Sequence, residues 1–246
     1  MPCQLHNNYP VYIWLNNDQS CLLCDGATAS AKTICEGCEA DLPWLTDYCE
    51  RCALPMPLSN LTCSQCTISP PAFEEVVAAW HYDFPVDSLV TRFKHQGKWP
   101  LGRLLAELFG EFLRYRFNEG LTRPDFLLPV PMASKRLRQR GYNQASMLAD
   151  WLGASLTLPV EPRLLKRVKE TPAQQGLDAK ARRRNLLDAF ELLTPYTVIG
   201  KHIAVVDDVL TTGSTADVIA RLLRKAGARQ VDVYCLARTA KPSGPL

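Results

Sequence analysis

The segment VVDDVLTTGST, residues 205–215, joins a β-branched apolar run to two adjacent carboxylates and then to a loop of small, hydroxyl-bearing residues. The apolar run at 202–206 predicts a buried strand, and the pattern at 215–225 predicts a helix. A helix N-terminus offers unpaired backbone N–H groups and the positive end of the helix dipole. The segment therefore predicts a strand, a loop and a helix arranged around an anionic ligand.

The residue types of the loop indicate a phosphate monoester as that ligand. Hydroxyl groups add hydrogen-bond donors to the backbone N–H groups, and glycine lets the backbone approach a ligand without an intervening β-carbon. The predicted phosphate-binding residues are Thr211, Thr212, Gly213, Ser214 and Thr215.

The two acids, Asp207 and Asp208, need a partner other than the phosphate. Vicinal sugar hydroxyls can donate to adjacent carboxylates, and a Mg²⁺ ion on the same diol would reduce the repulsion between the acids. A phosphate and a diol together describe a ribose 5-phosphate. An ordinary helix start, with Ser214 as the N-cap, is the alternative, but it leaves the two acids at the end of an apolar strand unexplained. The sequence has no Walker A motif.

Strands and helices alternate along the chain from residue 76 onward. The expected strands cover residues 76–82, 126–130, 202–206 and 230–237. The expected helices cover residues 86–95, 101–117, a stretch near 144–152, and 215–225. This alternation predicts an α/β fold with an open, mainly parallel sheet, in which ligands bind at the carboxyl ends of strands. The acidic pair is expected at such an end.

The first part of the chain has a different pattern, because eight of the ten cysteines form four C-x-x-C pairs spaced 14 residues apart. A segment this poor in apolar periodicity needs additional stabilisation, which Zn²⁺ bound by four thiolates supplies. All-cysteine coordination leaves no open position for catalysis, so two structural zinc ions are expected. The expected ligands are Cys21, Cys24, Cys35, Cys38, Cys49, Cys52, Cys63 and Cys66.

The spacing leaves open which pairs share a zinc ion. Sequential pairing would give a double zinc ribbon and interleaved pairing a cross-brace, and the spacing gives only a slight preference for the first. Free buried cysteines or a redox dithiol fit four evenly spaced pairs less well. Cys235 lies in an apolar run and is expected in the core. A Ser-Pro-Pro sequence at 69–71 closes the segment, which predicts a cysteine-rich domain at 1–70 and an α/β domain at 71–246.

Charge divides unevenly between these two predicted domains. Residues 1–70 carry two Lys/Arg against seven Asp/Glu, a net −5, whereas residues 71–246 carry 26 against 18, a net +8. The second domain is therefore the candidate for binding phosphates or nucleic acid. No window approaches the roughly 18 apolar residues of a membrane span, and the N-terminus lacks a signal-peptide pattern. A cytoplasmic protein without membrane insertion is expected.

Two basic stretches, both expected to form loops, are candidates to contact a pyrophosphate. KRLRQR, residues 135–140, has four basic residues in six, and residues 166–184 carry seven basic against two acidic residues. Each stretch could instead be a solvated basic face. Arginine pairs bidentately with phosphate oxygens, which favours Arg136, Arg138 and Arg140 for this role. The longer stretch is expected to be a mobile loop that closes over the ligand.

The segment at 205–215 resembles the phosphoribosyl pyrophosphate (PRPP) signature of type I phosphoribosyltransferases. The resemblance implies that Asp207 and Asp208 hold the ribose hydroxyls and that residues 211–215 hold the 5-phosphate. Thr211 stands where purine salvage enzymes of the hypoxanthine-guanine type carry an aspartate that acts on the purine ring. A hydroxyl does not readily replace that carboxylate near neutral pH, so 6-oxopurine salvage is not expected.

Two further segments narrow the resemblance to the ComF family. PVPMASKRLRQRGYNQASMLA, residues 129–149, is similar to that family's PVP…R…RG[FY]NQ…LA segment, and TPAQQGLDAKARRRNLLDAF, residues 171–190, to its TPxQxxLxxxxRRxNxxxAF segment. The C-x-x-C repeats resemble the family's double zinc ribbon. The resemblance implies a place in the flexible loop for Gln174, Arg182, Arg183 and Asn185. It implies a place in the loop near the pyrophosphate for Arg140, Gly141, Tyr142, Asn143 and Gln144.

The resemblance also implies a role in natural transformation, with PRPP, single-stranded DNA and DNA-uptake proteins as partners. One hypothesis is an enzyme that transfers ribose 5-phosphate from PRPP with Mg²⁺ to an unknown acceptor. The other is a non-catalytic single-stranded-DNA-handling module whose PRPP pocket is regulatory. A PRPP-responsive transcription regulator lacks support, since no helix-turn-helix signature occurs. The aromatics considered for base stacking, with a core position as the alternative, are Trp80, Tyr82, Trp99 and Tyr142. No catalytic residue is assigned.

Overall fold

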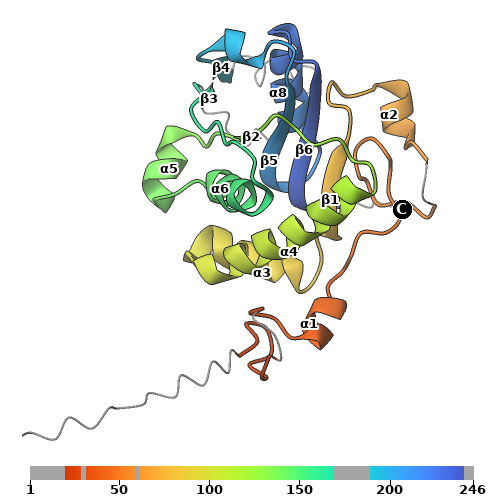
Figure 1. The fold of residues 1–246 in the computed structure, drawn as a ribbon, viewed down its shortest axis with the longest axis vertical. Coiled ribbons are helices and arrows are strands. Elements are labelled where there is room, and N and C mark those ends of the chain that lie inside the picture. The colour runs from red at the N-terminus through yellow and green to blue at the C-terminus, as the bar shows by residue number, and fades with distance from the viewer. Residues whose placement is uncertain (1–19, 29–31, 59–60, 169–188, 241–246) are drawn as a thin grey trace, which may run out of the picture. The chain divides into compact units, whose positions relative to one another are not determined.

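A computed structural model of the chain describes residues 20–28, 32–58, 61–168 and 189–240. Two compact units divide between Asp41 and Leu42, inside the segment 1–70 that the sequence groups as one domain. The first unit contains α1 (Glu36–Ala40), and the second contains α2 (Ser64–Ile68) and all the strands (Figure 1). Within the described residues, every helix is too short or too polar to cross a bilayer.

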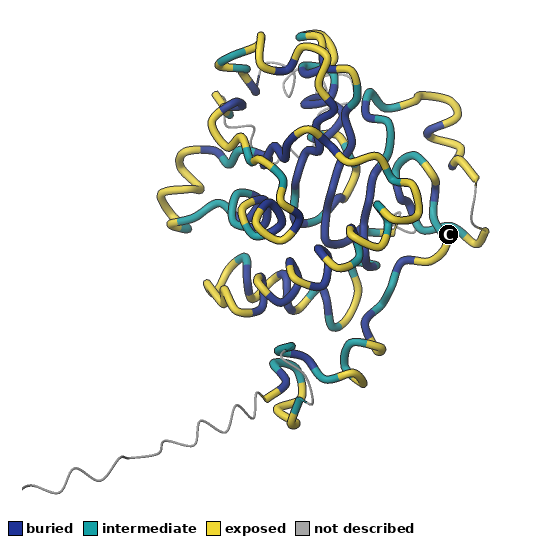
Figure 2. Tube along the Cα trace, viewed as in Figure 1, coloured by how far each residue is buried: buried dark blue, intermediate teal, exposed yellow. Residues whose placement is uncertain are grey.

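The second unit is built on a four-stranded sheet in which every neighbouring pair is parallel, as the alternating pattern predicts. The order is β1-β6-β5-β2, formed by β1 (Val76–His81), β6 (Gln230–Arg238), β5 (His202–Leu210) and β2 (Phe126–Pro129). The strands are the most deeply buried part of the chain (Figure 2). Burial on both faces explains why these strands are continuous apolar runs rather than alternating ones.

Four long helices cover the sheet and lie close to their predicted positions. They are α3 (Val86–Gln96), α4 (Trp99–Asn118), α6 (Gln144–Leu156) and α8 (Ser214–Lys225). Helix α8 packs its buried face, including Ile219 and Leu223, with the alternate strand residues Ile203 and Val205. Helices α4 and α6 contact β6 and β5. The packing of α8 fixes the loop that precedes it against the end of β5.

Two sequence predictions, the end of one strand and the loop at 135–140, are wrong for identifiable reasons. The strand expected to end at Val206 continues to Leu210, because β6 pairs with it as far as Arg238 and this pairing overrides the low strand propensity of aspartate. The stretch 135–140, expected as a loop, forms α5 (Ser134–Arg140). Its long, unbranched side chains favour a helix, and Gly141 ends the helix in the left-handed conformation at φ 85°.

The remaining elements are short. Strands β3 (Leu165–Arg167) and β4 (Phe190–Leu192) form an antiparallel pair. β3 precedes and β4 follows the segment 169–188, which lies outside the described residues. The 3₁₀ helix η1 (Pro195–Val198) leads into β5. Sequence periodicity does not reveal β3 and β4, because three residues are too few to show a period.

Residues of the cysteine-rich segment from Leu42 onward pack directly on the sheet. The N–H of Leu45 donates to the carbonyl of Ala79 at 2.9 Å, and that of His81 donates to the carbonyl of Pro43 at 2.8 Å. Ala53 and Phe73 are buried in the same core cluster as the strands and α8. The second pair of C-x-x-C units thus shares a compact unit with the α/β sheet.

Candidate functional site

The acidic pair lies in the last part of β5, where the strand leaves the core. Asp208 is buried and Asp207 half-buried. The backbone N–H of Asp208 donates to the Asp207 carboxylate at 2.9 Å, and that of Val209 donates to the Asp208 carboxylate at 2.7 Å. Burial raises the pKa of Asp207 to about 7; repulsion from Asp208 adds to the shift, and nearby Lys94 and Arg167 oppose it. Two crowded carboxylates of this kind favour binding a cation or hydroxyl donors.

Lys94 supplies a cation to this pair. Its Nζ lies 2.8 Å from an oxygen of Asp208, with the lysine side chain 28% and the aspartate side chain 9% exposed. Sequence reasoning missed this residue, since a lysine in the last turn of an amphipathic helix ordinarily indicates a solvated position. The ion pair depends on how α3 packs beside β5, and periodicity does not specify that.

The hydroxyl-rich loop occupies the N-terminus of α8, as predicted. Thr211 and Thr212 are exposed, and Ser214 begins the helix. The hydroxyls of Thr212 and Ser214 lie 2.9 Å apart, and the N–H of Ser214 points to the Thr212 hydroxyl at 3.3 Å. These donors surround the turn at Gly213, an arrangement suited to a small anion.

Gly213 adopts a positive φ of 75°, which disfavours any residue with a β-carbon. The space around it is open, since nothing lies within 4 Å of an added β-carbon. Gly213→Ala is therefore expected to cost about 1 kcal/mol through the backbone alone and to weaken phosphate-ligand binding severalfold. Thermal unfolding and calorimetry with ribose 5-phosphate measure the two effects. Gly120 also has a positive φ but lies far away along the chain. Equal weakening of ribose 5-phosphate binding in Gly120→Ala would contradict a local role for Gly213.

The segment from Gly141 to Gln144, which the resemblance assigns to a loop near the pyrophosphate, connects α5 to the start of α6 and hydrogen-bonds to the end of α3. The hydroxyl of Tyr142 donates to the carbonyl of Phe93. Asn143 caps α6 by accepting from the N–H of Ala145 at 3.2 Å, and it donates to the carbonyl of Val130 at 3.0 Å. Gln144 is buried and donates to the carbonyl of Lys94 at 3.2 Å. These bonds fix the end of α3 that carries Lys94, while contact with a pyrophosphate stays a prediction.

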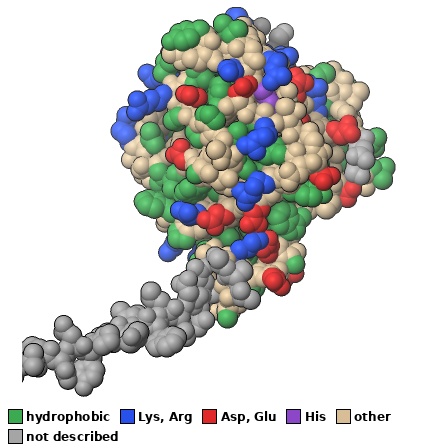
Figure 3. Space-filling model, in the orientation of Figure 1, with side chains coloured by type: hydrophobic (Ala, Val, Ile, Leu, Met, Phe, Trp, Pro, Cys, Tyr) green, Lys and Arg blue, Asp and Glu red, His purple; other side chains and the backbone are tan. Residues whose placement is uncertain are grey.

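Of the arginines predicted to bind pyrophosphate, the structure describes the three on α5. Arg136 and Arg138 are exposed and Arg140 is half-buried on α5, where Figure 3 shows Lys and Arg side chains at the edge of the molecule. Gln174, Arg182, Arg183 and Asn185 lie outside the described residues. The segment that contains them starts and ends at one place, because the N–H of Val168 donates to the carbonyl of Ala189 at 2.8 Å. Arg167, beside that place, acts electrostatically on Asp207.

The eight paired cysteines form two clusters, and the pairing is sequential. The first comprises Cys21, Cys24, Cys35 and Cys38, the second Cys49, Cys52, Cys63 and Cys66, and within each cluster the sulfur atoms lie within 4.8 Å of one another. The sulfur–sulfur distances of 3.8 Å from Cys24 to Cys35 and 3.8 Å from Cys52 to Cys63 match a zinc tetrahedron, in which a Zn–S bond of about 2.3 Å separates the sulfurs by about 3.8 Å.

The backbone favours a thiolate at one cysteine of each cluster, whereas neighbouring cysteines raise the pKa of Cys38 and burial raises that of Cys66. The N–H of Leu23 donates to the Cys21 sulfur at 3.4 Å, and that of Cys63 donates to the Cys49 sulfur at 3.2 Å. Although burial acts in the opposite direction, backbone donors lower the pKa of Cys21 to about 6 and that of Cys49 to about 7. Both clusters therefore fit structural zinc. Cys235 is fully buried in β6, as predicted for a core residue.

The four aromatics considered for base stacking differ in exposure. Trp80 is completely buried, so stacking on a base is excluded for it. Tyr142 packs between Phe93 and Trp99, with ring centroids about 6 Å from each. Tyr82 is half-buried, and Trp99 is 54% exposed.

Comparison with known proteins agrees with both parts of this description. The double zinc ribbon domain family matches residues 18–67, and the phosphoribosyl transferase domain family matches residues 164–246. Competence protein F of Haemophilus influenzae is 37% identical over 225 residues, which cover 89% of this chain and 96% of that protein. DNA utilization protein YhgH of Escherichia coli K12 is 35% identical over 220 residues, which cover 89% of this chain and 90% of that protein.

The fold and the matches define a protein with a double zinc ribbon and a domain of the type I phosphoribosyltransferase kind. The similarity to competence protein F extends over both domains and so identifies the family within this class. The chain belongs to the ComF family.

Proposed function

We propose that the chain binds PRPP as its Mg²⁺ complex. Asp207 and Asp208 hold the metal-bound ribose hydroxyls, and the 211–215 loop holds the 5-phosphate. The observation that carries the proposal is the continuity of the site: the acids in β5 and the hydroxyl loop at the start of α8 are adjacent along the chain and lie at one edge of a parallel sheet. That edge is where ligands bind in open α/β sheets.

The acids and the loop suit different parts of one ligand. The acids are partly or fully buried and carry a raised pKa at Asp207, so a divalent cation or paired hydroxyls relieve their repulsion. The loop presents a helix N-terminus and exposed hydroxyls, which suit the phosphate. We place the pyrophosphate toward the basic groups of α5 and toward Arg167, which acts electrostatically on Asp207. If transfer occurs, these cations stabilise the departing pyrophosphate.

The biological setting is proposed from the relatives. Their names refer to competence and to DNA utilization, and we assign this chain to cytoplasmic handling of incoming or scavenged DNA. Thr211 stands in place of the purine-salvage aspartate, so we propose an acceptor other than a 6-oxopurine for the phosphoribosyl group.

Calorimetric titration of the full-length protein with PRPP, in the presence and absence of Mg²⁺, tests the proposal. Binding is expected with Mg²⁺ and at least about tenfold weaker without it, because the acids then face the diol without a bridging cation. A screen for pyrophosphate release against nucleobases and oligonucleotides separates transfer from simple binding. Absence of any PRPP binding in the presence of Mg²⁺ would overturn the proposal.

A second candidate function is a single-stranded-DNA-handling module in which PRPP regulates DNA binding. The specific observation is α5, a helix with four basic residues in seven, of which Lys135, Arg136 and Arg138 are exposed. Cations on one short helix can follow a phosphate backbone, and each neutralised phosphate adds about 0.7 to the salt slope for a single strand.

Replacing Arg136, Arg138 and Arg140 by glutamate is expected to reduce the slope of log affinity against log salt by about 2. Fluorescence anisotropy with a labelled oligonucleotide at several salt concentrations measures the slope. Lys225→Glu with Arg229→Glu, exposed at the last residue of α8 and just beyond it, is the control. Equal slopes in the α5 variant and the wild type would exclude α5 as the DNA contact.

A further inference from the structure

The second cysteine module, residues 49–66, faces the proposed phosphate loop across a shared cavity. The cavity has a volume of about 230 Å³. On one side it is lined by the loop residues 210–214, and on the other by Cys52, Leu54, Gln65 and Cys66. Two of the four expected zinc ligands therefore line the same space as the residues proposed to hold the 5-phosphate.

Arg238, the last residue of β6, connects the two sides. Its side chain is buried, with the residue only 5% exposed. Its Nε donates to the carbonyl of Cys52 at 2.9 Å, and one terminal nitrogen donates to the carbonyl of Leu210 at 3.0 Å and also to that of Thr211. A buried guanidinium is costly unless it is hydrogen-bonded. The same group thus holds the backbone of a zinc ligand and the first residues of the loop.

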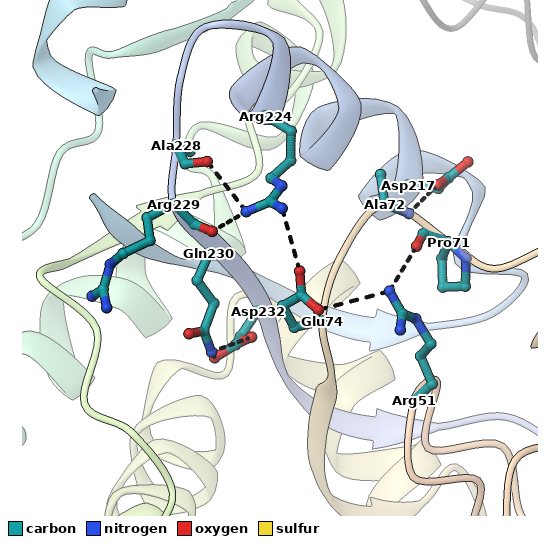
Figure 4. A network of polar contacts seen from close by, with 10 residues as sticks. All are labelled: Arg51, Pro71, Ala72, Glu74, Asp217, Arg224, Ala228, Arg229, Gln230 and Asp232. Carbon is teal, nitrogen blue, oxygen red and sulfur yellow. Dashed lines mark hydrogen bonds and ion pairs between the residues drawn. The ribbon is translucent and has the colours of Figure 1, made fainter. Parts of the chain in front are cut away.

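A second set of contacts ties the module to α8 (Figure 4). Arg51, which lies between Cys49 and Cys52, donates to the carbonyl of Pro71 at 3.1 Å and lies 3.8 Å from Glu74. Glu74 also lies 3.7 Å from Arg224 of α8. These side chains are 33–41% exposed, so each ion pair contributes little on its own.

The buried Asp217 makes a firmer link to the same helix. Its carboxylate accepts from the N–H of Ala72 at 2.8 Å, just after the module. Asp217 lies in the first turn of α8, next to the loop, and it also lines the cavity. The module is therefore attached to the start of the 210–214 segment through Arg238, and the chain that follows the module is attached at Ala72 to the end of that segment through Asp217.

We propose that the second cysteine module is a working part of the phosphate site, with Arg238 as the positioning residue that connects them. Four-thiolate coordination fixes the backbone at Cys52. Through its hydrogen bonds to Cys52 and Leu210, Arg238 fixes the loop in the conformation that binds the phosphate. Because coupling between the binding free energies of two sites is reciprocal, a bound phosphate ligand strengthens zinc binding at the second cluster. The first cluster lies in the other compact unit and takes no part. The inference rests on the proposed function, since it concerns the same loop.

Zinc release from the full-length wild-type protein tests the coupling without any substitution. A colorimetric chelator, titrated to equilibrium, reports the release of two zinc ions per chain, in buffer alone, with saturating ribose 5-phosphate, or with ribose. Ribose 5-phosphate is expected to raise about tenfold the chelator concentration that removes one of the two zinc ions, while ribose leaves both releases unchanged. Calorimetry first establishes that ribose 5-phosphate binds. A protein that binds neither ribose 5-phosphate nor PRPP would overturn the proposed function. A protein that binds ribose 5-phosphate but releases zinc as it does in buffer alone would overturn only the coupling.

Matched cysteine variants identify the site involved. Cys49→Ser with Cys63→Ser removes two ligands from the second cluster, and Cys21→Ser with Cys35→Ser removes the corresponding two from the first. Affinity for ribose 5-phosphate is expected to fall about tenfold in the former and to stay unchanged in the latter. An equal effect of the two variants would contradict the proposal. If the second-cluster variant fails to fold, the wild-type release experiment still decides.

Arg238→Lys tests the connecting residue while keeping its charge. Lysine lacks the planar fork that reaches Cys52 and Leu210 together. The variant is expected to keep two zinc ions but to bind ribose 5-phosphate about tenfold more weakly, without ligand protection of zinc. Arg224→Lys, in the partly exposed network of Figure 4, is the control and is expected to retain both properties. Normal ligand protection in Arg238→Lys would overturn its role.

Discussion

Replacing both acids, Asp207→Asn with Asp208→Asn, is expected to weaken Mg²⁺-dependent PRPP binding at least about 100-fold. Each hydrogen bond or metal contact made by an ionised carboxylate contributes about 1.5–3 kcal/mol, and two such losses correspond to about 3–6 kcal/mol, where every 1.4 kcal/mol is tenfold. Neutral amides also lack the charge that attracts the cation. Calorimetry with PRPP and Mg²⁺ gives the affinities.

The double variant is expected to remain folded. Burial raises the pKa of Asp207, so the ionised carboxylate is unfavourable in the folded protein and a neutral side chain of the same shape removes that cost. Asp208→Asn does leave Lys94 without its charged partner, but that lysine is still 28% exposed and reaches water. Circular dichroism and thermal unfolding of the variant check this point.

Asp150→Asn, an exposed carboxylate on α6, is the matched control and is expected to bind PRPP as the wild type does. PRPP affinity of the double variant within about threefold of the wild type would show that the acids do not hold the ligand. The loop at 211–215 alone would then be too small a site for a phosphoribosyl group.

The acids and the hydroxyl loop of the candidate site are consecutive in the sequence, so their arrangement could be predicted from it. An apolar run, two acids, a loop of hydroxyls and a helical pattern are consecutive in the sequence, and the structure joins β5 to α8 in that order. The C-x-x-C pairs are local in the same sense. Their sequential grouping became certain only in the structure, which brings together the sulfurs of Cys21 and Cys38 and, separately, those of Cys49 and Cys66.

The parts that were missed depend on residues distant in sequence. Lys94 and Asp208 are 114 positions apart, and Arg238 and Cys52 are 186 apart. Neither contact leaves a periodic signal, because each depends on how two elements pack rather than on which residues follow one another. The true end of β5 likewise follows from its pairing with β6 and not from its own composition.

Trp80→Ala is expected to have the largest effect on stability, about 4 kcal/mol, which lowers the melting temperature by roughly 10 °C in a chain of this size. Trp80 is completely buried in β1, an outer strand of the sheet. Its ring packs against Trp44 at 5.3 Å and against Phe109 at 6.5 Å between centroids. The alanine variant leaves a cavity between the sheet, α4 and the segment that carries Trp44. Differential scanning calorimetry or denaturant unfolding measures the loss.

Two controls separate packing from nucleic-acid contact. Trp80→Phe keeps an aromatic ring and removes the indole N–H, which is buried without a hydrogen-bond partner among the described residues; it is expected to cost less than about 1.5 kcal/mol. Trp99→Ala, at a 54% exposed position, is expected to change stability by less than about 0.5 kcal/mol. A Trp80→Ala protein of wild-type stability with weakened single-stranded-DNA binding would contradict the core assignment and return Trp80 to the candidates for base stacking.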